Sequence, residues 1–96
     1  MRLSAILDLK RAAVRDTVSR NKAANPRIFG SALHGADDDK SDLDILVDAL
    51  PGATLFDLGG LQVELQELLG IEVDLLTPED LPPRFRAKVL AEAEPV

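Results

Sequence analysis

The strongest constraint on the fold of this chain is the segment Asp42–Asp48, in which two aspartates separated by one residue precede the apolar run Ile45-Leu46-Val47. A short apolar run of this kind is typical of a buried strand, whereas aspartate is disfavoured in strands. On a strand, Asp42 and Asp44 point to the same face, with Cα atoms about 6.6 Å apart. We therefore expect a strand that carries a pair of carboxylates at its start.

A turn of small residues stands before this strand. Gly30-Ser31 follows a short apolar strand expected over Arg27–Phe29. Gly30 permits close backbone approach, and Ser31 adds a hydroxyl and can begin a short helix over Ala32–His34. Because N–H groups at the start of a helix bind anions, the turn is a candidate phosphate cradle. Taken alone, a Gly-Ser pair after a strand is more often an ordinary turn.

The hydrophobic pattern as a whole predicts an α/β (α+β) fold with the order α-β-α-β-α-β-α around a small mixed three-stranded sheet. We expect one domain over residues 1–96. The other expected elements are a helix over 4–22 stopped by Asn25-Pro26, a turn at Pro51-Gly52, a helix from the Thr54 cap to Gly70, a strand over Ile71–Leu76, a helix start at Thr77–Asp80, a break at Pro82-Pro83 and a final helix over 84–93.

Composition and charge exclude several functional classes. The chain has a net charge of −6, no cysteine, no tryptophan and no tyrosine. Nucleic-acid affinity depends on basic residues that neutralise phosphates and on aromatic stacking, so direct nucleic-acid binding is not expected. Disulfides and thiolate zinc sites are excluded. No apolar run approaches the roughly 18 residues of a membrane helix and the start does not resemble a signal peptide, so we expect a soluble, cytoplasmic protein.

A third carboxylate stands in the last expected strand. Asp74 alternates with Val73 and Leu75, and if this strand pairs beside the one that follows Asp42, its carboxylate can reach the same metal ions. Magnesium prefers such oxygen ligands, and two ions about 3.5–4 Å apart can clamp the oxygens of a phosphoryl displacement. Asp74 could also accept the proton of an attacking hydroxyl. The alternative is that Asp42 caps the loop and that Asp44 and Asp74 lie on solvent-exposed edge strands.

The combined pattern, Gly-Ser-x10-Asp-x-Asp with a further strand aspartate thirty residues later, resembles the DNA polymerase β-like nucleotidyltransferase superfamily. The short length and the order of elements resemble its minimal nucleotidyltransferases, the antitoxins paired with HEPN-domain ribonuclease toxins. The resemblance covers about residues 3–92. It implies that Gly30 and Ser31 hold the nucleotide's phosphates, that Asp42 and Asp44 ligate two magnesium ions, and that Asp74 completes the metal site and helps to activate the acceptor.

The resemblance also implies a reaction. A magnesium-dependent enzyme of this family transfers a nucleoside monophosphate, usually AMP from ATP, to a hydroxyl and releases pyrophosphate; in the antitoxins the acceptor is a tyrosine of the HEPN toxin. Because little chain remains beyond the core to bind an acceptor, we expect a partner protein to bring it, in a hetero-oligomer. Two alternatives stay open, namely an antitoxin that only occludes its toxin and a small-molecule nucleotidyltransferase.

His34 departs from the pattern of many relatives, which carry arginine before the second glycine of the turn. A neutral imidazole stabilises phosphate less than a guanidinium, so a phosphate contact by His34 implies slower transfer; an exposed turn residue is the alternative. Asp37-Asp38-Asp39 is expected to be a solvated loop or a rim for a basic partner. The basic residues of the last helix are expected on a solvated face, or in contact with the triphosphate or the toxin: Arg84, Arg86 and Lys88.

Overall fold

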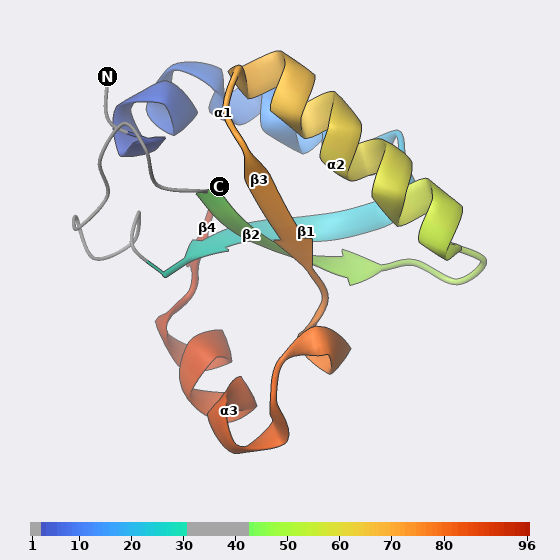
Figure 1. Cartoon of the computed structure of the whole chain (residues 1–96), viewed down its shortest axis with the longest axis vertical. Coiled ribbons are helices and arrows are strands. Elements are labelled where there is room, and N and C mark those ends of the chain that lie inside the picture. The colour runs from blue at the N-terminus through green and yellow to red at the C-terminus, as the bar shows by residue number, and fades with distance from the viewer. Residues whose placement is uncertain (1–2, 31–42) are drawn as a thin grey trace.

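The structure is a computed structural model that describes residues 3–30 and 43–96 of the chain (Figure 1). Within these ranges the elements are α1 (Leu3–Ser19), β1 (Ala23–Phe29), β2 (Leu43–Ala49), α2 (Leu55–Leu69), β3 (Val73–Leu76), the 3-10 helix η1 (Pro78–Asp80), α3 (Pro83–Glu92) and β4 (Glu94–Pro95). The predicted order of helices and strands is therefore confirmed in the described residues, with one strand added at the end.

The strands form one mixed sheet in the order β3-β2-β1-β4. β2 and β3 run parallel, whereas β1 is antiparallel to both of its neighbours. Helices α1 and α2 lie on one side of this sheet and α3 lies on the other (Figure 1). The predicted α/β (α+β) class is confirmed. The sheet has four strands and not the predicted three, because the two residues of β4 pair with Arg27 and Ile28 of β1.

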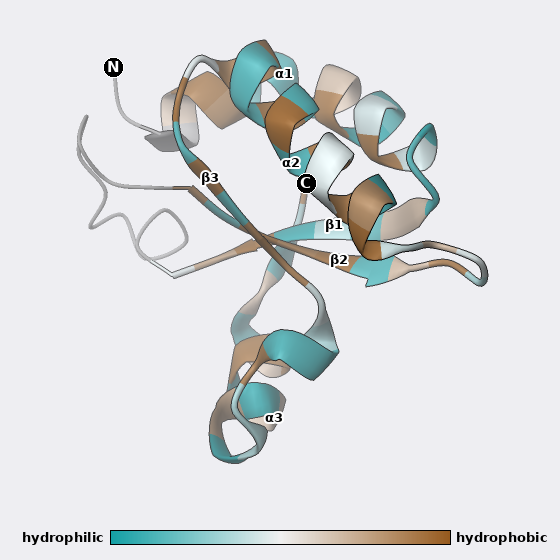
Figure 2. Ribbon diagram, turned by 45° about the vertical axis from the view of Figure 1, so that its right-hand side comes forward, coloured by the Kyte–Doolittle hydropathy of each residue, from teal (hydrophilic) through white to brown (hydrophobic). Residues whose placement is uncertain are grey.

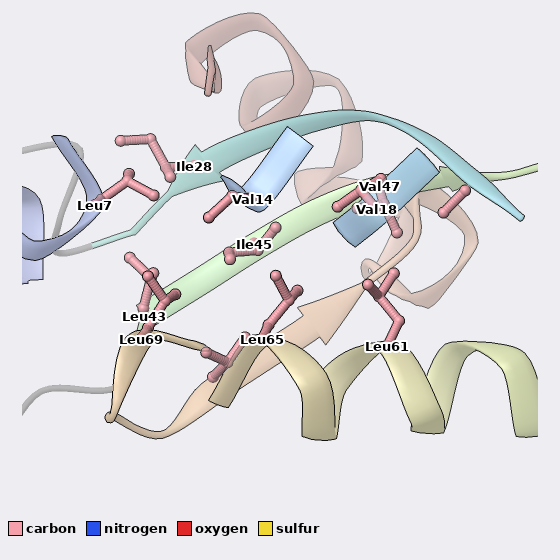
Figure 3. Close-up of a cluster of buried hydrophobic side chains, with 12 residues drawn as sticks. Leu7, Val14, Val18, Ile28, Leu43, Ile45, Val47, Leu61, Leu65 and Leu69 are labelled. Carbon is pink, nitrogen blue, oxygen red and sulfur yellow. The ribbon is translucent and has the colours of Figure 1, made fainter. Parts of the chain in front are cut away.

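The hydrophobic core fills the space between the sheet and the pair α1 and α2 (Figure 3). β2 alternates strictly at this face, with Leu43, Ile45 and Val47 fully buried. The β2 ribbon is mostly hydrophobic, whereas α1 mixes hydrophobic and hydrophilic residues, as an amphipathic helix does (Figure 2). The remaining core residues come from the two helices and the flanking strands: Leu7, Val14, Val18, Ala23, Ile28, Leu61, Leu65, Leu69 and Val73.

The connection from α1 to β1 differs from the prediction. The helix ends at Ser19 and β1 already begins at Ala23, so the expected stop at Asn25-Pro26 is wrong. Asn25 adopts a positive φ of 52°, which asparagine tolerates better than most residues, and the pairing register of β1 with β2 shifts between Ala24 and Arg27. Such a bulge accommodates a proline that an uninterrupted strand would exclude.

Helix α2 begins and ends where its local signals place it. Thr54 and Asp57 form a reciprocal capping box, and Gly70 ends the helix in the left-handed conformation with φ of 71°. Two glutamines of α2 also cover the free edge of the sheet. The N–H of Val73 donates to Gln66 at 3.1 Å, and the N–H of Leu75 donates to Gln62 at 3.4 Å. Edge N–H groups of β3 are thereby satisfied, which blunts the edge against pairing with another chain.

The segment after β3 is held mainly by one arginine. The predicted helix start at Thr77–Asp80 is the single turn η1, and the helix resumes at Pro83 as α3. The Arg86 guanidinium donates to the carbonyls of Pro78, Glu79 and Leu81, at 2.7, 3.3 and 3.0 Å. None of the residues of α3 is buried, so these bonds and the pairing of β4 fasten this helix. No helix in the described residues has the length and apolarity needed to cross a membrane.

Candidate active site

Two of the predicted carboxylates meet on the face of the sheet opposite α1 and α2. In the parallel pairing of β2 with β3, Asp44 is directly in register with Asp74. Their neighbours Leu43, Ile45 and Val73 point into the core, so the two aspartates point to the other face. Adjacent strands lie about 4.7–4.9 Å apart, which brings the two carboxylates within reach of one cation. The condition on which the reach of Asp74 depended, the pairing of the third strand beside the second, is met in the structure.

Gly30 closes one side of this carboxylate pair. It follows β1 directly after Phe29, which is the antiparallel partner of Asp44, and it has a φ of 75°. A Cβ at this position would collide with Oδ2 of Asp44 and would lie 3.3 Å from its Cγ. Gly30 thus has a backbone conformation that glycine readily adopts, and the group that it approaches here is the Asp44 carboxylate.

The row behind the carboxylates is apolar. Leu46 is in register with Leu76 on the same face as Asp44 and Asp74, and Leu46 is fully buried although it lies outside the main core. Leu81, just after η1, is also buried. Asp44 is half-buried and Asp74 is exposed, so the site opens toward solvent on the side of Asp74. Apolar neighbours lower the local dielectric and strengthen interactions of the carboxylates with a bound cation.

Another carboxylate of β2, Asp48, lies farther along the same face and binds the residues of the bulge in β1. Asn25 donates to it at 2.9 Å, and Arg27 forms a 3.2 Å ion pair with it. The hydrogen bond from Asn25, and then the hydrogen bond and charge of Arg27, lower the pKa of Asp48 despite partial desolvation. This network was not indicated by the sequence, because its members meet only through the bulge. Asp48 is therefore a structural carboxylate and not a site candidate.

The donor set fits a hard divalent cation. No cluster of three or more potential metal ligands occurs among residues 3–30 and 43–96. Magnesium usually takes only one or two protein carboxylates and completes its shell with water and phosphate oxygens. Asp44 and Asp74 can supply that number of ligands. They also repel each other at short range, and a cation between them relieves the repulsion.

Several predicted site residues lie outside the described residues: Ser31, His34 and Asp42, together with the short helix over Ala32–His34 and the acidic run Asp37-Asp38-Asp39. Of the predicted set, the structure brings together Gly30, Asp44 and Asp74. The basic residues of α3 separate into two kinds. Arg86 holds the η1 carbonyls, so its expected place on a solvated face is wrong, whereas Arg84 and Lys88 are exposed as expected.

Comparison with known proteins identifies the family. The nucleotidyltransferase domain model matches residues 11–95. "Putative protein adenylyltransferase MJ0435" of Methanocaldococcus jannaschii is 44% identical over 66 residues, which cover 69% of this chain and 71% of that protein. A solved structure described as a "putative minimal nucleotidyltransferase" is 40% identical in sequence and has a TM-score of 0.88. The match covers 97% of this chain and 95% of that chain.

A more distant solved structure, a toxin–antitoxin complex with AMP-PNP, is 23% identical with a TM-score of 0.69 over 83% of this chain and 66% of that chain, and it shares the fold. The family model spans both strands that carry the paired aspartates and the turn before them, and the 40% identical structure extends over nearly the whole chain. The chain therefore belongs to the nucleotidyltransferase domain family, as one of its minimal members.

Proposed function

We propose that this nucleotidyltransferase transfers AMP from ATP to a hydroxyl of a partner protein, a HEPN-type ribonuclease toxin, and thereby acts as its antitoxin. The observation that carries the proposal is the register of Asp44 with Asp74 beside Gly30, on the sheet face that α1 and α2 leave uncovered. A nucleotidyltransferase needs carboxylates that hold magnesium and a small-residue turn that admits phosphate at one place, and the placement of Gly30 beside Asp44 and Asp74 supports the proposal.

The metal site of the proposal consists of Asp42, Asp44 and Asp74. Asp44 and Asp74 contribute oxygens from neighbouring strands, and Asp42 precedes Asp44 by two residues. We propose two magnesium ions at these carboxylates, as the resemblance to the superfamily implies. Bound there, magnesium would neutralise phosphate charge in the transition state.

The residues themselves have separate tasks in the proposed reaction. The turn of Gly30 and Ser31, with His34, binds the phosphates of ATP. Asp74 accepts the proton of the acceptor hydroxyl, whose oxygen then bonds to the α-phosphorus. The bond from the α-phosphorus to the oxygen that bridges to the β-phosphorus breaks, and pyrophosphate leaves with that oxygen. Asp44 is half-buried and Asp74 is exposed, so an acceptor hydroxyl can approach these carboxylates from solvent.

Support for a protein acceptor comes from relatives. Similar proteins from Methanocaldococcus jannaschii carry the name of a protein adenylyltransferase, and a toxin–antitoxin complex with a bound ATP analogue shares the fold. The HEPN class of the toxin and its tyrosine acceptor follow from the family resemblance of the sequence. A reaction that uses ATP also suits the cytoplasm, where we propose that the protein acts.

The test is a transfer assay with the purified chain, magnesium and the HEPN-type toxin from the neighbouring reading frame. We expect label from α-phosphate-labelled ATP to enter the toxin and label from γ-phosphate-labelled ATP to leave as pyrophosphate. Asp44→Asn and Asp74→Asn should each lower transfer by at least about 100-fold, since each removes a charged ligand from the reacting centre. Asp48→Asn, on the same strand face, is the matched control and should retain transfer.

Two outcomes would overturn the proposal in different directions. If Asp44→Asn abolishes transfer but still neutralises the toxin fully, the chain acts by occlusion. If a hydroxylated small molecule is modified without any partner protein and the toxin is not, the acceptor is not a protein. Folding of each variant is checked by circular dichroism, so that loss of transfer is not mistaken for unfolding.

A further inference from the structure

The position of the Asp74 carboxylate depends on the backbone of β3. Asp74 is exposed, and no side chain within residues 3–30 and 43–96 forms a hydrogen bond or an ion pair with it. β3 has four residues and lies at the edge of the sheet, with β2 as its one neighbour among the described strands. Asp44, by contrast, lies on the seven-residue strand β2, which pairs with β1 on one side and with β3 on the other. The strand that carries Asp74 therefore has backbone pairing on one edge only.

Two glutamines of α2 take the place of a strand on the outer edge of β3. Alternate residues of a strand direct their peptide groups to opposite edges, so Val73 and Leu75, which flank Asp74, direct theirs away from β2. The N–H of Val73 donates to Oε1 of Gln66 at 3.1 Å, and the N–H of Leu75 donates to Oε1 of Gln62 at 3.4 Å. The outer edge is thus bonded immediately before and immediately after Asp74.

Helix α2 fixes where these two side-chain amides lie. Gln62 and Gln66 are four residues apart, so they share one helix face. Each follows a fully buried core residue, Leu61 or Leu65, and the packing of these leucines holds the helix backbone against the sheet. Both glutamines are half-buried. Removal of one partner of such a bond leaves the other group unsatisfied, which costs more than the bond itself contributes. The two hydrogen bonds therefore define a preferred position of β3 relative to the core.

We propose that Gln62 and Gln66 are positioning residues of the active site, which hold β3 so that the Asp74 carboxylate stays beside Asp44 at the separation that a shared cation requires. This role rests on the proposed function, in which Asp74 ligates magnesium and accepts the proton of the acceptor hydroxyl. The geometric requirement is strict, because magnesium demands oxygens at about 2.0–2.1 Å, and a displacement of about 1 Å can cost about 100-fold in rate. Gln66 should matter more than Gln62, since its hydrogen bond is the shorter of the two.

A role limited to protection of the sheet edge makes a different prediction. If the glutamines only satisfied the edge N–H groups, their loss would lower stability and expose the edge to another chain, without a change in the affinity of the site for magnesium. A positioning role changes this affinity as well, because loss of a group that orients a metal ligand typically costs about 10–100-fold in metal affinity or activity. The magnesium dissociation constant therefore separates the two roles.

The first measurement is the magnesium dissociation constant of the purified chain without nucleotide or partner protein, followed by NMR at the Asp74 carboxyl signal. Gln66→Met keeps the length of the side chain but has no amide oxygen, and we expect it to raise this constant by about 10-fold. Gln62→Met should raise it by less. Glu67→Met, at an exposed residue of the same helix, is the matched control and should leave the constant unchanged.

Amide exchange and kinetics complete the test. The N–H of Val73 should exchange with deuterated water faster in Gln66→Met than in the wild type. Gln66→Glu keeps an acceptor oxygen and should restore both the slow exchange and transfer. In the transfer assay, Gln66→Met should lower kcat by about 10-fold and leave the KM for the partner protein unchanged, because Asp74 acts on an acceptor that is already bound. Circular dichroism checks that each variant is folded.

The outcomes distinguish this role from the proposed reaction. Suppose that the wild type labels the toxin and Asp74→Asn does not, but Gln66→Met keeps the wild-type magnesium dissociation constant and kcat. The glutamines are then an edge cover only, the positioning role is overturned, and the proposed reaction stands. If instead the wild type labels no toxin, although Gln66→Met weakens magnesium binding, the proposed reaction is wrong and the glutamines still position Asp74.

Discussion

The two faces of the central sheet differ in what their side chains do. Toward α1 and α2, β2 presents only aliphatic residues that are fully buried, among them Ile45. On the other face the same strand presents Asp44 and Asp48, which are half-buried, with Leu46 between them. One face therefore supplies most of the stability of the domain, and the other holds the carboxylates. Because neighbouring residues of one strand serve these separate ends, substitutions at adjacent positions should have separable effects.

The largest effect is expected on the helix-covered face. Ile45→Ala removes three methyl or methylene carbons from a fully buried position, and it should lower the free energy of unfolding by about 2–5 kcal/mol. That is a large share of the roughly 5–15 kcal/mol typical of a domain. Urea denaturation followed by circular dichroism measures the loss. Asp44→Asn, one residue away, should change the same quantity by less than about 1 kcal/mol while it abolishes transfer. Equal destabilisation by both would show that the two faces are not separable.

Gly30 directly follows β1 and lies close to Asp44 on the carboxylate face. A substitution there can therefore affect both the stability of the domain and nucleotide transfer. Gly30→Ala forces a side chain onto a φ of 75°, which costs about 1–2 kcal/mol, and it also collides with Asp44. We expect nucleotide transfer to fall further than the loss of stability explains. Both are measured on the same preparation, by urea denaturation and the transfer assay.

The matched control for this substitution is Gly52→Ala. Gly52 has a φ of 89°, but a Cβ there meets nothing within 4 Å, so the variant carries the backbone strain without the collision. It should lose a similar amount of stability and keep its transfer activity. If the two variants lose transfer equally, the contact of Gly30 with Asp44 is not important for the site.

The parts of the fold that could be predicted are those with local signals. The cap at Thr54, the glycine that ends α2 and the alternation of β2 each depend on residues a few positions apart, and the structure confirms all three. The side-by-side placement of Asp44 and Asp74 also followed from alternation, given that the two strands pair. Local chemistry was therefore enough for the helix boundaries of α2 and for the carboxylate pair.

The features that could not be predicted depend on distant partners. β4 has only two residues, one of them proline, and it is a strand only because β1 lies beside it. From the neighbouring sequence alone, Asn25-Pro26 predicts the end of a helix or strand. Only the pairing of β1 with β2 makes this segment a bulge within a strand. Arg86 appeared to be a surface charge because its carbonyl partners belong to a turn whose geometry the sequence does not reveal. In each case a long-range pairing decided between two locally reasonable structures.

The smallest effect is expected at Asp48, the carboxylate that serves the bulge. The hydrogen bond from Asn25, with the hydrogen bond and charge of Arg27, lowers the pKa of Asp48 in the folded state. An aspartate with a lowered folded pKa stabilises the protein above its unfolded pKa of about 3.9, and this contribution is lost as the pH falls through the folded pKa. The stability advantage of the wild type over Asp48→Asn should therefore be constant near neutral pH and shrink below about pH 4.

Because this ion pair is partly exposed, the contribution should be no more than about 1 kcal/mol, and it is best read as a difference between variants. The Asp48 carboxyl signal, followed by NMR titration, reports the same effect directly. Asn25→Gly removes the amide donor and keeps a residue suited to a φ of 52°, so it should raise the pKa of Asp48 toward its ordinary value without straining the bulge. An unchanged titration midpoint would show that Arg27, and not Asn25, holds this carboxylate. The acid sensitivity of the bulge would then reside in the ion pair alone, and raising the salt concentration should remove it.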